Sequence, residues 1–240
     1  MAVITDLYLP PDADDVALAC GPRRERVTPP GIRRCISSVL SHMSEEQWLA
    51  PAISYQIHPI TDRATDWMEL SGRIRLSSPL LMHRLRRASS VVFGVCSIGP
   101  RLSQQASAWF AAGERLKAVI LDDIGTAALF KLGDRLEAVI SKQSLAMGLQ
   151  ASGTSSPGEE GFDVTAQAQV LELAGGSDIG VLLKGGGLLV PHKSMTSVIG
   201  LGEKMTRWSR RDTCAACSAS DRCPYRHGSV EFTPIRHSRE

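Results

Sequence analysis

A stretch of about thirty residues with helical periodicity constrains the fold of this chain more than any other feature. Between Glu114 and Leu145, apolar side chains recur three or four positions apart over many turns, which is the spacing of one face of an α-helix. The preceding segment, Leu102 to Ala112, carries small and apolar residues and stops at Gly113. We therefore predict two consecutive helices, of which the second is long.

Short apolar or alternating segments on either side of these helices predict strands. The continuous apolar run from Val91 to Ile98 has the length of a buried strand. Ala52 to Ile60 alternates loosely and predicts a strand that stops at Pro59. Ile179–Leu183 and Leu188–Val190 flank three consecutive glycines, which predicts a hairpin. Strands and helices together indicate an α/β domain.

Capping and turn residues predict the elements between these segments. Apolar residues at spacing four predict a helix over 30–41, and Ser44 followed by two glutamates predicts the N-cap of a short helix that ends near Ala50. Two more helices are predicted over 79–88 and 164–173, and a short one from Asp14 to about Cys20. Residues 148–161 are rich in Gly, Ser and Pro and predict a polar loop.

Composition places the chain among ordinary folded proteins. Of its 240 residues, 43% are hydrophobic and 22% are charged, which is enough to bury a core, and the length fits one globular body with an appended tail. The net charge is +2, and the short arginine groups at 84–87 and 207–211 are typical of solvated helix faces, not of the concentrated basic face that nucleic acid requires.

The same survey gives expectations about location. No segment approaches the roughly 18 to 20 apolar residues of a membrane span, and the first eleven residues lack the build of a signal peptide. We therefore expect a cytoplasmic protein with no membrane partner and no nucleic-acid partner.

Three of the six cysteines lie within ten residues of one another near the C-terminus. The C-x2-C step from Cys214 to Cys217 lets two thiolates converge on one ion, and with Cys223 the set predicts zinc or an iron–sulfur cluster, because soft sulfur selects these metals. Such sites usually have four ligands. The alternatives are a cluster with three protein ligands and one open iron, or a set of free or redox-paired thiols. The candidates for a fourth ligand are His227, Cys96, Cys20 and Cys35.

Other motifs fail on their spacing. Gly185–Gly187 lies in no G-x4-G-K-[ST] sequence, so it is not a phosphate-binding loop. Asp123 and Asp134 share a face of the long helix but are about 16 Å apart, too far to act on one bond. We expect Asp134 to cap or to form an ion pair with Lys131 or Arg135. No histidine pair or serine motif indicates catalysis, and the sequence leaves open whether the chain is an enzyme.

Several segments occur in an order that is known from one family. Residues 92–99 form a strand and turn, residues 121–138 form part of the long helix, Ser156-Pro157-Gly158 lies in a polar loop, and 191–200 contains Pro-x-Lys-Ser. In this order they resemble the activation domain of cobalamin-dependent methionine synthase and the small stand-alone proteins related to it. The Cys-x2-Cys ending with a later Cys-Pro-Tyr-Arg is similar to that of the stand-alone members. The resemblance runs from about Val91 to Arg226.

The resemblance implies a helmet-like α/β (α+β) fold, with a curved, mostly antiparallel sheet and long helices. Residues 1–205 would form this single domain, in which the first ninety residues resemble the family least. Residues 206–240 would form a Cys-rich metal-binding tail. In the methionine synthase the domain binds S-adenosylmethionine and docks over the corrinoid during reductive remethylation of inactive cobalamin. The positions that the resemblance marks as cofactor-binding are Pro157, Gly158, Lys193, Ser194, Ser197 and Asp123.

The sequence departs from the family in the adenosylmethionine loop. That enzyme carries an arginine three positions before the proline and a tyrosine after the glycine, where this chain has Thr154 and Glu159. An arginine would hold the methionine carboxylate by a charge-assisted bidentate contact, which Thr154 cannot make, and Glu159 would repel that carboxylate. Both replacements count against adenosylmethionine as a ligand.

Two functional hypotheses of different classes follow. The first is an accessory protein for corrinoid chemistry, which binds or caps a cobalamin, a corrinoid protein or a corrinoid methyltransferase, with the tail cluster as an electron relay to cobalt. The alternative is a non-catalytic interaction module with a degenerate adenosylmethionine pocket and a structural zinc tail that joins two chains as a homodimer or recruits a partner. A methyltransferase that uses adenosylmethionine directly is a third reading, which the missing Rossmann-type glycine motif disfavours.

Overall fold

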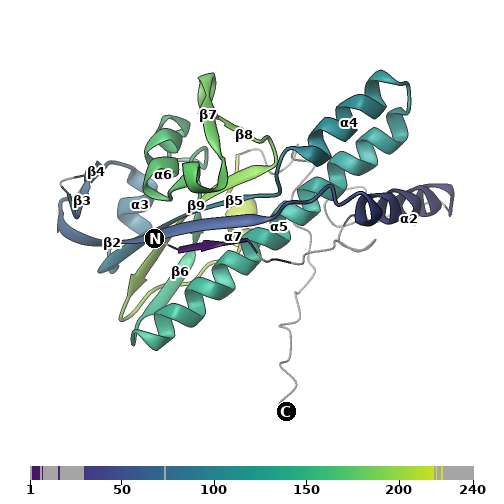
Figure 1. The fold of residues 1–240 in the computed structure, drawn as a ribbon. Coiled ribbons are helices and arrows are strands. Elements are labelled where there is room, and N and C mark those ends of the chain that lie inside the picture. Colours follow the sequence, from purple (N-terminus) through teal and green to yellow (C-terminus); the bar gives the residue numbers. More distant parts are fainter. Residues whose placement is uncertain are drawn as a thin grey trace, which may run out of the picture.

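The computed structural model describes residues 2–5, 7, 16, 30–72, 74–218, 220 and 223. These residues form an antiparallel sheet of seven strands with helices on both of its faces (Figure 1). A separate hairpin of two strands projects from one side (Figure 1). In the part of the chain described, no helix has the length and apolar character that crossing a bilayer requires.

The large sheet has the strand order β4-β3-β2-β5-β9-β6, and β1 pairs with the same edge of β2 that β3 extends. Every pairing is antiparallel. The strands are β1 (Ala2–Ile4), β2 (Ala52–Arg63), β3 (Met68–Leu70), β4 (Ile74–Leu76), β5 (Ser90–Ser97), β6 (Gln150–Ser155), β7 (Leu182–Lys184), β8 (Leu188–Val190) and β9 (Ser194–Gly202).

Six α-helices and three short 3₁₀ turns complete the described fold. The α-helices are α2 (Pro30–Glu45), α3 (Pro79–Arg84), α4 (Arg101–Ala111), α5 (Arg115–Ala146), α6 (Gln167–Leu173) and α7 (Arg210–Ala215). The 3₁₀ turns are η2 (Val164–Ala166), η3 (Gly176–Ile179) and η4 (Gly185–Gly187).

The sheet separates two hydrophobic cores, because successive side chains of a strand point to opposite faces. On β5, Val92 and Cys96 join the core beneath α2, α4 and α5. Val91, Phe93 and Val95 join the core beneath α3 and α6. This strand is buried along nearly its whole length, which explains why its sequence is a continuous apolar run and not an alternating one.

A glycine in β5 lets the long helix lie close to the sheet. A Cβ atom at Gly94 would lie 2.6 Å from Cδ2 of Leu136 on α5, and Leu136 is itself buried. One turn earlier on α5, a Cβ at Gly133 would lie 3.2 Å from Sδ of Met195 on β9. The close approach places the middle of α5 directly over β5 and β9, where the cavity described below is found.

The structure confirms the predicted fold class, a mixed α/β fold with a curved antiparallel sheet (Figure 1). The two predicted consecutive helices are α4 and α5, and the predicted hairpin around the glycines is β7–β8. The short helix predicted from Asp14 to Cys20 lies outside the described residues apart from Val16.

Three local predictions are wrong. The helix predicted to start at Ser44 does not form, because α2 already runs to Glu45 and the chain then turns at Gln47, which has φ 50°. Strand β2 continues past Pro59 to Arg63, because Pro59 pairs with the first residue of β5, where a missing ladder donor disrupts little. Part of the predicted polar loop, 150–155, is strand β6.

Candidate functional site

A cavity of about 190 Å³ lies between α5, β6, β9 and α7. Its floor is the sheet, and its walls come from segments far apart in the sequence. The residues that line it are Phe130, Gly133, Glu137, Thr154, Ser156, Glu159, Met195, Ser197, Arg210 and Thr213. Because these include residues of the predicted adenosylmethionine loop and Ser197, this cavity is the candidate site.

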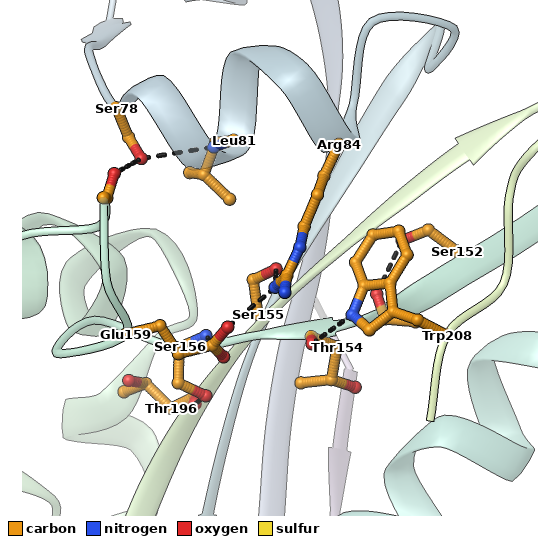
Figure 2. Close-up of polar contacts among 12 residues, drawn as sticks. Ser78, Leu81, Arg84, Ser152, Thr154, Ser155, Ser156, Glu159, Thr196 and Trp208 are labelled. Atoms are coloured by element: carbon orange, nitrogen blue, oxygen red, sulfur yellow. Dashed lines mark hydrogen bonds and ion pairs between the residues drawn. The ribbon is translucent and has the colours of Figure 1, made fainter. Parts of the chain in front are cut away.

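The turn that follows β6 is fastened by Glu159. One carboxylate oxygen accepts a hydrogen bond from the backbone N–H of Ser156 (2.7 Å), and the other forms an ion pair with Nη1 of Arg84 (2.7 Å) (Figure 2). Gly158 takes a left-handed conformation, with φ 96°, and its N–H donates to the carbonyl of Phe162 (2.8 Å). The Ser-Pro-Gly-Glu turn therefore has a defined shape without a ligand.

Arg84 was expected on a solvated helix face, and this expectation is wrong. Its guanidinium donates to Oγ of Ser155 (2.8 Å) as well as to Glu159, and its Cζ lies 4.7 Å from the centroid of the Trp208 ring (Figure 2). The side chains of Arg84 and Glu159 are 16% and 19% exposed. A pair this far removed from water is stable only when its remaining hydrogen-bonding groups are satisfied, and Ser155 and the Ser156 N–H provide that here.

Trp208 ties the start of the predicted tail to the sheet. Its indole Nε1 donates to the carbonyl of Thr154 on β6 (2.8 Å) (Figure 2). A Cβ at Gly153 would lie 2.6 Å from Cδ1 of the indole, so the ring occupies the space of a missing side chain. The boundary predicted at residues 205/206 stays a prediction, but Trp208 packs against the core of the domain.

Helix α7 follows directly and contributes Arg210 to the cavity wall. Nη2 of Arg210 pairs with Oδ1 of Asp134 on α5 (2.6 Å) and donates to the carbonyl of Phe130 (3.3 Å), and its Cζ lies 4.5 Å from the centroid of the Phe130 ring. The described ion pair of Asp134 thus reaches across to α7 instead of to a neighbour on its own helix. Burial raises the pKa of Asp134, with a smaller rise from Glu137 and opposing contributions from Arg210 and Lys131.

The hydroxyl groups near the cavity already have partners. Oγ1 of Thr154 donates to Oε1 of Glu137 on α5 (2.5 Å). Oγ of Ser156 donates to the carbonyl of Thr196 (2.9 Å) (Figure 2), and Oγ1 of Thr196 accepts from Nε2 of Gln167 (2.9 Å). Thr154, which stands where the family has its carboxylate-binding arginine, is therefore engaged with α5.

Four of the six predicted cofactor-binding residues line three different cavities. Ser197 lines the one just described. Gly158, which follows Pro157 in the turn, lines a second cavity of about 500 Å³ together with Ser78 and Asp163. Asp123 and Lys193, with residues of α4, line a third cavity of about 470 Å³.

Two of these predicted residues have structural contacts that explain their positions. Nζ of Lys193 pairs with Oδ1 of Asp122 (2.9 Å) and donates to Oγ1 of Thr126 (2.8 Å), so it ties the loop before β9 to α5. Oγ of Ser194 donates to Oγ of Ser97 (3.0 Å) across the paired strands β9 and β5. The predicted cofactor-binding residues therefore lie in separate places and do not surround one ligand position.

The tail cysteines Cys214, Cys217 and Cys223 are among the described residues, and the metal site predicted for them stays a prediction. Among the residues that the structure describes, no group of three or more histidine, cysteine, aspartate or glutamate side chains has the arrangement of a metal site. Cys214 and Cys223 are partly buried and Cys217 is exposed. Two of the candidate fourth ligands, Cys20 and His227, lie outside the described residues. Cys35 belongs to α2 and packs against the core beneath α2, α4 and α5.

Cys96, the remaining candidate, is enclosed between β5 and α5. Its thiol donates to the carbonyl of Leu132 (3.8 Å). Burial raises its pKa to about 12, which opposes the thiolate form that binds metals. The structure therefore gives Cys96 a role in the core.

Comparison with known proteins shows which known fold this chain has. No family model matches the sequence, and no curated protein matches it. A solved structure does match: the crystal structure of the MetH reactivation domain bound to AdoHcy, with a TM-score of 0.57 and 14% sequence identity. The match covers 71% of this chain and 64% of that chain. This chain has the reactivation-domain fold.

The match confirms the family resemblance predicted from the sequence, at the level of the fold. The AdoHcy belongs to the solved relative, and the present chain spans 64% of that relative's length. Sequence reasoning missed three residues of the site: Arg84, Trp208 and Arg210. No local sequence pattern indicates them, because each contacts its partner across more than fifty positions of sequence.

Proposed function

We propose that the chain is an accessory module for corrinoid chemistry, which caps a corrinoid or a corrinoid-protein partner and assists its reductive activation. The observation that carries the proposal is the reactivation-domain fold with its adenosylmethionine-type loop fastened by the Arg84–Glu159 pair. The fold supports an association with corrinoid chemistry, and the fastened loop counts against direct use of adenosylmethionine.

The size and the lining of the cavity favour this division of roles. Pockets for drug-sized ligands usually have about 300 to 1,000 Å³, whereas this cavity has about 190 Å³. Arg210, which lines it, is paired with Asp134, and Arg84 is paired with Glu159. An amino-acid carboxylate in this cavity would therefore compete with Asp134 for Arg210. Capping a corrinoid requires a surface and not a deep pocket, so a small cavity is compatible with it.

The tail metal remains part of the proposal. Cys214, Cys217 and Cys223 are the residues that would hold zinc or an iron–sulfur cluster, although their described side chains are not arranged as a metal site. Zinc would supply rigidity, whereas an iron–sulfur cluster would supply an electron. Metal analysis of protein purified without oxygen distinguishes the two, and protein that retains neither metal contradicts this part.

The experiment for the main proposal is a pair of titrations on the full chain under anaerobic conditions. We expect cob(II)alamin to co-elute with the protein in gel filtration and to change its visible absorption spectrum, and we expect adenosylhomocysteine to give no heat at millimolar concentration in calorimetry. Micromolar binding of adenosylhomocysteine without retention of cobalamin would contradict the proposal.

A second candidate function is the interaction module with a structural zinc. The hairpin β7–β8 favours it, because Leu182 and Leu188 are 60% and 61% exposed, and exposed apolar side chains on a projecting element are typical of contact surfaces. One zinc per chain, no iron and no retention of cobalamin would support this candidate over the first.

A further inference from the structure

Helix α7 covers the cavity with little packing to hold it. None of its six residues is buried. Arg210, Thr213 and Cys214 are its partly buried residues, and their spacing of three and four places them on one side of the helix. Arg210 and Thr213 of this side line the cavity. An element with so few buried apolar contacts belongs to the part of a structure that opens at low cost.

Among the described contacts, Arg210 fastens this helix to α5 by an ion pair, a backbone hydrogen bond and a stacking contact with the Phe130 ring. Arg210 reaches Asp134 and the carbonyl of Phe130 from the first position of α7. The two side chains are 25% and 43% exposed, so water screens their attraction, and a partly exposed ion pair adds little to the stability of a fold. The contact closes the cavity but contributes little to holding the domain together.

The segment on the N-terminal side of α7 is held much more firmly. Trp208 donates to the Thr154 carbonyl and lies beneath the Arg84 guanidinium. Between this anchor and the helix stands Ser209, whose side chain and backbone form a capping box with Asp212. Because the capping box is internal to residues 209–212, α7 can move as a unit without breaking it.

We propose that α7 is a flap over the cavity, hinged at the link between the Trp208 anchor and Ser209 and latched by the ion pair between Arg210 and Asp134. Breaking the latch exposes Ser197 and Glu137 on the cavity floor and wall while the rest of the domain keeps its structure. The proposal goes beyond the corrinoid function and does not depend on it, because it concerns access to the cavity and not the identity of a ligand.

Chemical labelling of a thiol placed inside the cavity tests the flap in the 240-residue chain. Ser197, which is 2% exposed, is replaced in the variant Ser197→Cys, and the rate of iodoacetamide modification at position 197 is measured by peptide mass spectrometry. Adding Arg210→Ala should raise this rate about two- to fivefold, as expected for loss of a partly exposed ion pair. Asp134→Asn, which removes the charge at the other end of the latch, should raise it in the same direction.

Two controls separate flap opening from other causes. Arg211→Ala changes the neighbouring, exposed arginine and should leave the rate at position 197 unchanged. Cys96, in the closed core, reports global unfolding in the same samples and should stay unmodified. Unchanged labelling at position 197 in both latch variants would overturn the flap. Labelling that rises in step at Cys96 would overturn it as well, because the opening would then be global.

Discussion

Two arginines approach strand β6 from its two faces and form similar contacts that differ in strength. Arg84 reaches Ser155 and Arg210 lies beside Thr154 in the cavity wall, and consecutive residues of a strand point to opposite faces. Each arginine pairs with a carboxylate and lies over an aromatic ring. The Arg84 pair is mostly buried and is tied into a turn, whereas the Arg210 pair is partly exposed and holds a short helix.

This difference indicates that burial, and not the type of contact, decides which pair is structural. The energy of an ion pair between solvent-exposed groups is small, but removal of one partner from a buried pair leaves an uncompensated charge in a poorly solvated place. We therefore expect the Arg84 pair to set the stability of the domain and the Arg210 pair to set access to its cavity.

The largest effect should come from Arg84→Ala. It leaves the Glu159 carboxylate without its cation and removes the group that lies over Trp208. We expect a loss of about 2 to 3 kcal/mol in the free energy of unfolding, somewhat below the value for a fully buried pair, measured by urea denaturation. Arg86→Ala, at an exposed residue in the turn that follows α3, is the matched control. Equal stability of the two variants would show that the comparison is wrong.

A smaller effect is expected from Trp208→Phe, which acts on both pairs. The change removes the hydrogen bond to the Thr154 carbonyl but retains an aromatic ring under Arg84. We expect a loss of about 1 kcal/mol in the free energy of unfolding and faster thiol labelling at position 197. Trp67→Phe, at a tryptophan stacked with the exposed Arg75, should do neither. Unaltered labelling in the Trp208 variant would mean that the hinge does not depend on this anchor.

Arg210→Ala should change the free energy of unfolding by less than about 1 kcal/mol, because its ion pair is partly exposed. Its effect should instead be local: amide hydrogen exchange in α7 should accelerate while exchange in β5 stays slow. If Arg210→Ala costs as much stability as Arg84→Ala, the two ion pairs contribute equally to the fold and burial does not distinguish them.

The smallest effect concerns the pH dependence at Asp134. Its pKa is raised by burial, with Glu137 adding to the rise and Arg210 and Lys131 opposing it. The folded state therefore binds this proton more tightly than the unfolded state, so the contribution of Asp134 to stability is present below its unfolded pKa and is lost as pH rises through its folded pKa. In urea denaturation, Asp134→Asn should be more stable relative to the parent at pH 7 than at pH 4. The opposite trend would mean that Arg210 outweighs burial.

The helices and central strands could be predicted because their residues repeat with a regular spacing. The apolar positions of α5 and the continuous run of β5 are local signals, and both elements lie within a few residues of their predicted bounds. Strand β6 was missed because its sequence, Gln-Ala-Ser-Gly-Thr-Ser, consists mainly of turn-forming residues. Its glycine is required by the Trp208 ring, and that reason lies more than fifty positions away.

The candidate site was predicted in part, for a related physical reason. The Ser-Pro-Gly turn and Ser197 could be placed by resemblance, because they are contiguous motifs. Arg84 and Arg210 could not, because each meets its carboxylate across 75 or 76 positions of sequence, and neither lies in a motif. Long-range charge pairing is decided by the packing of the sheet and the helices, which no local pattern contains.

The segment that leads to α7 also has a consequence for how copies of this protein meet. Strand β6 ends the sheet on one side, and an uncovered edge strand invites pairing with another chain. The N–H of Met205 donates to the Gln150 side chain and the Trp208 indole donates to the Thr154 carbonyl, so this segment runs along that edge and occupies one of its acceptors. A flap hinged after Trp208 can swing open while the edge stays covered; a hinge placed a few residues earlier would turn each opening into an opportunity for aggregation.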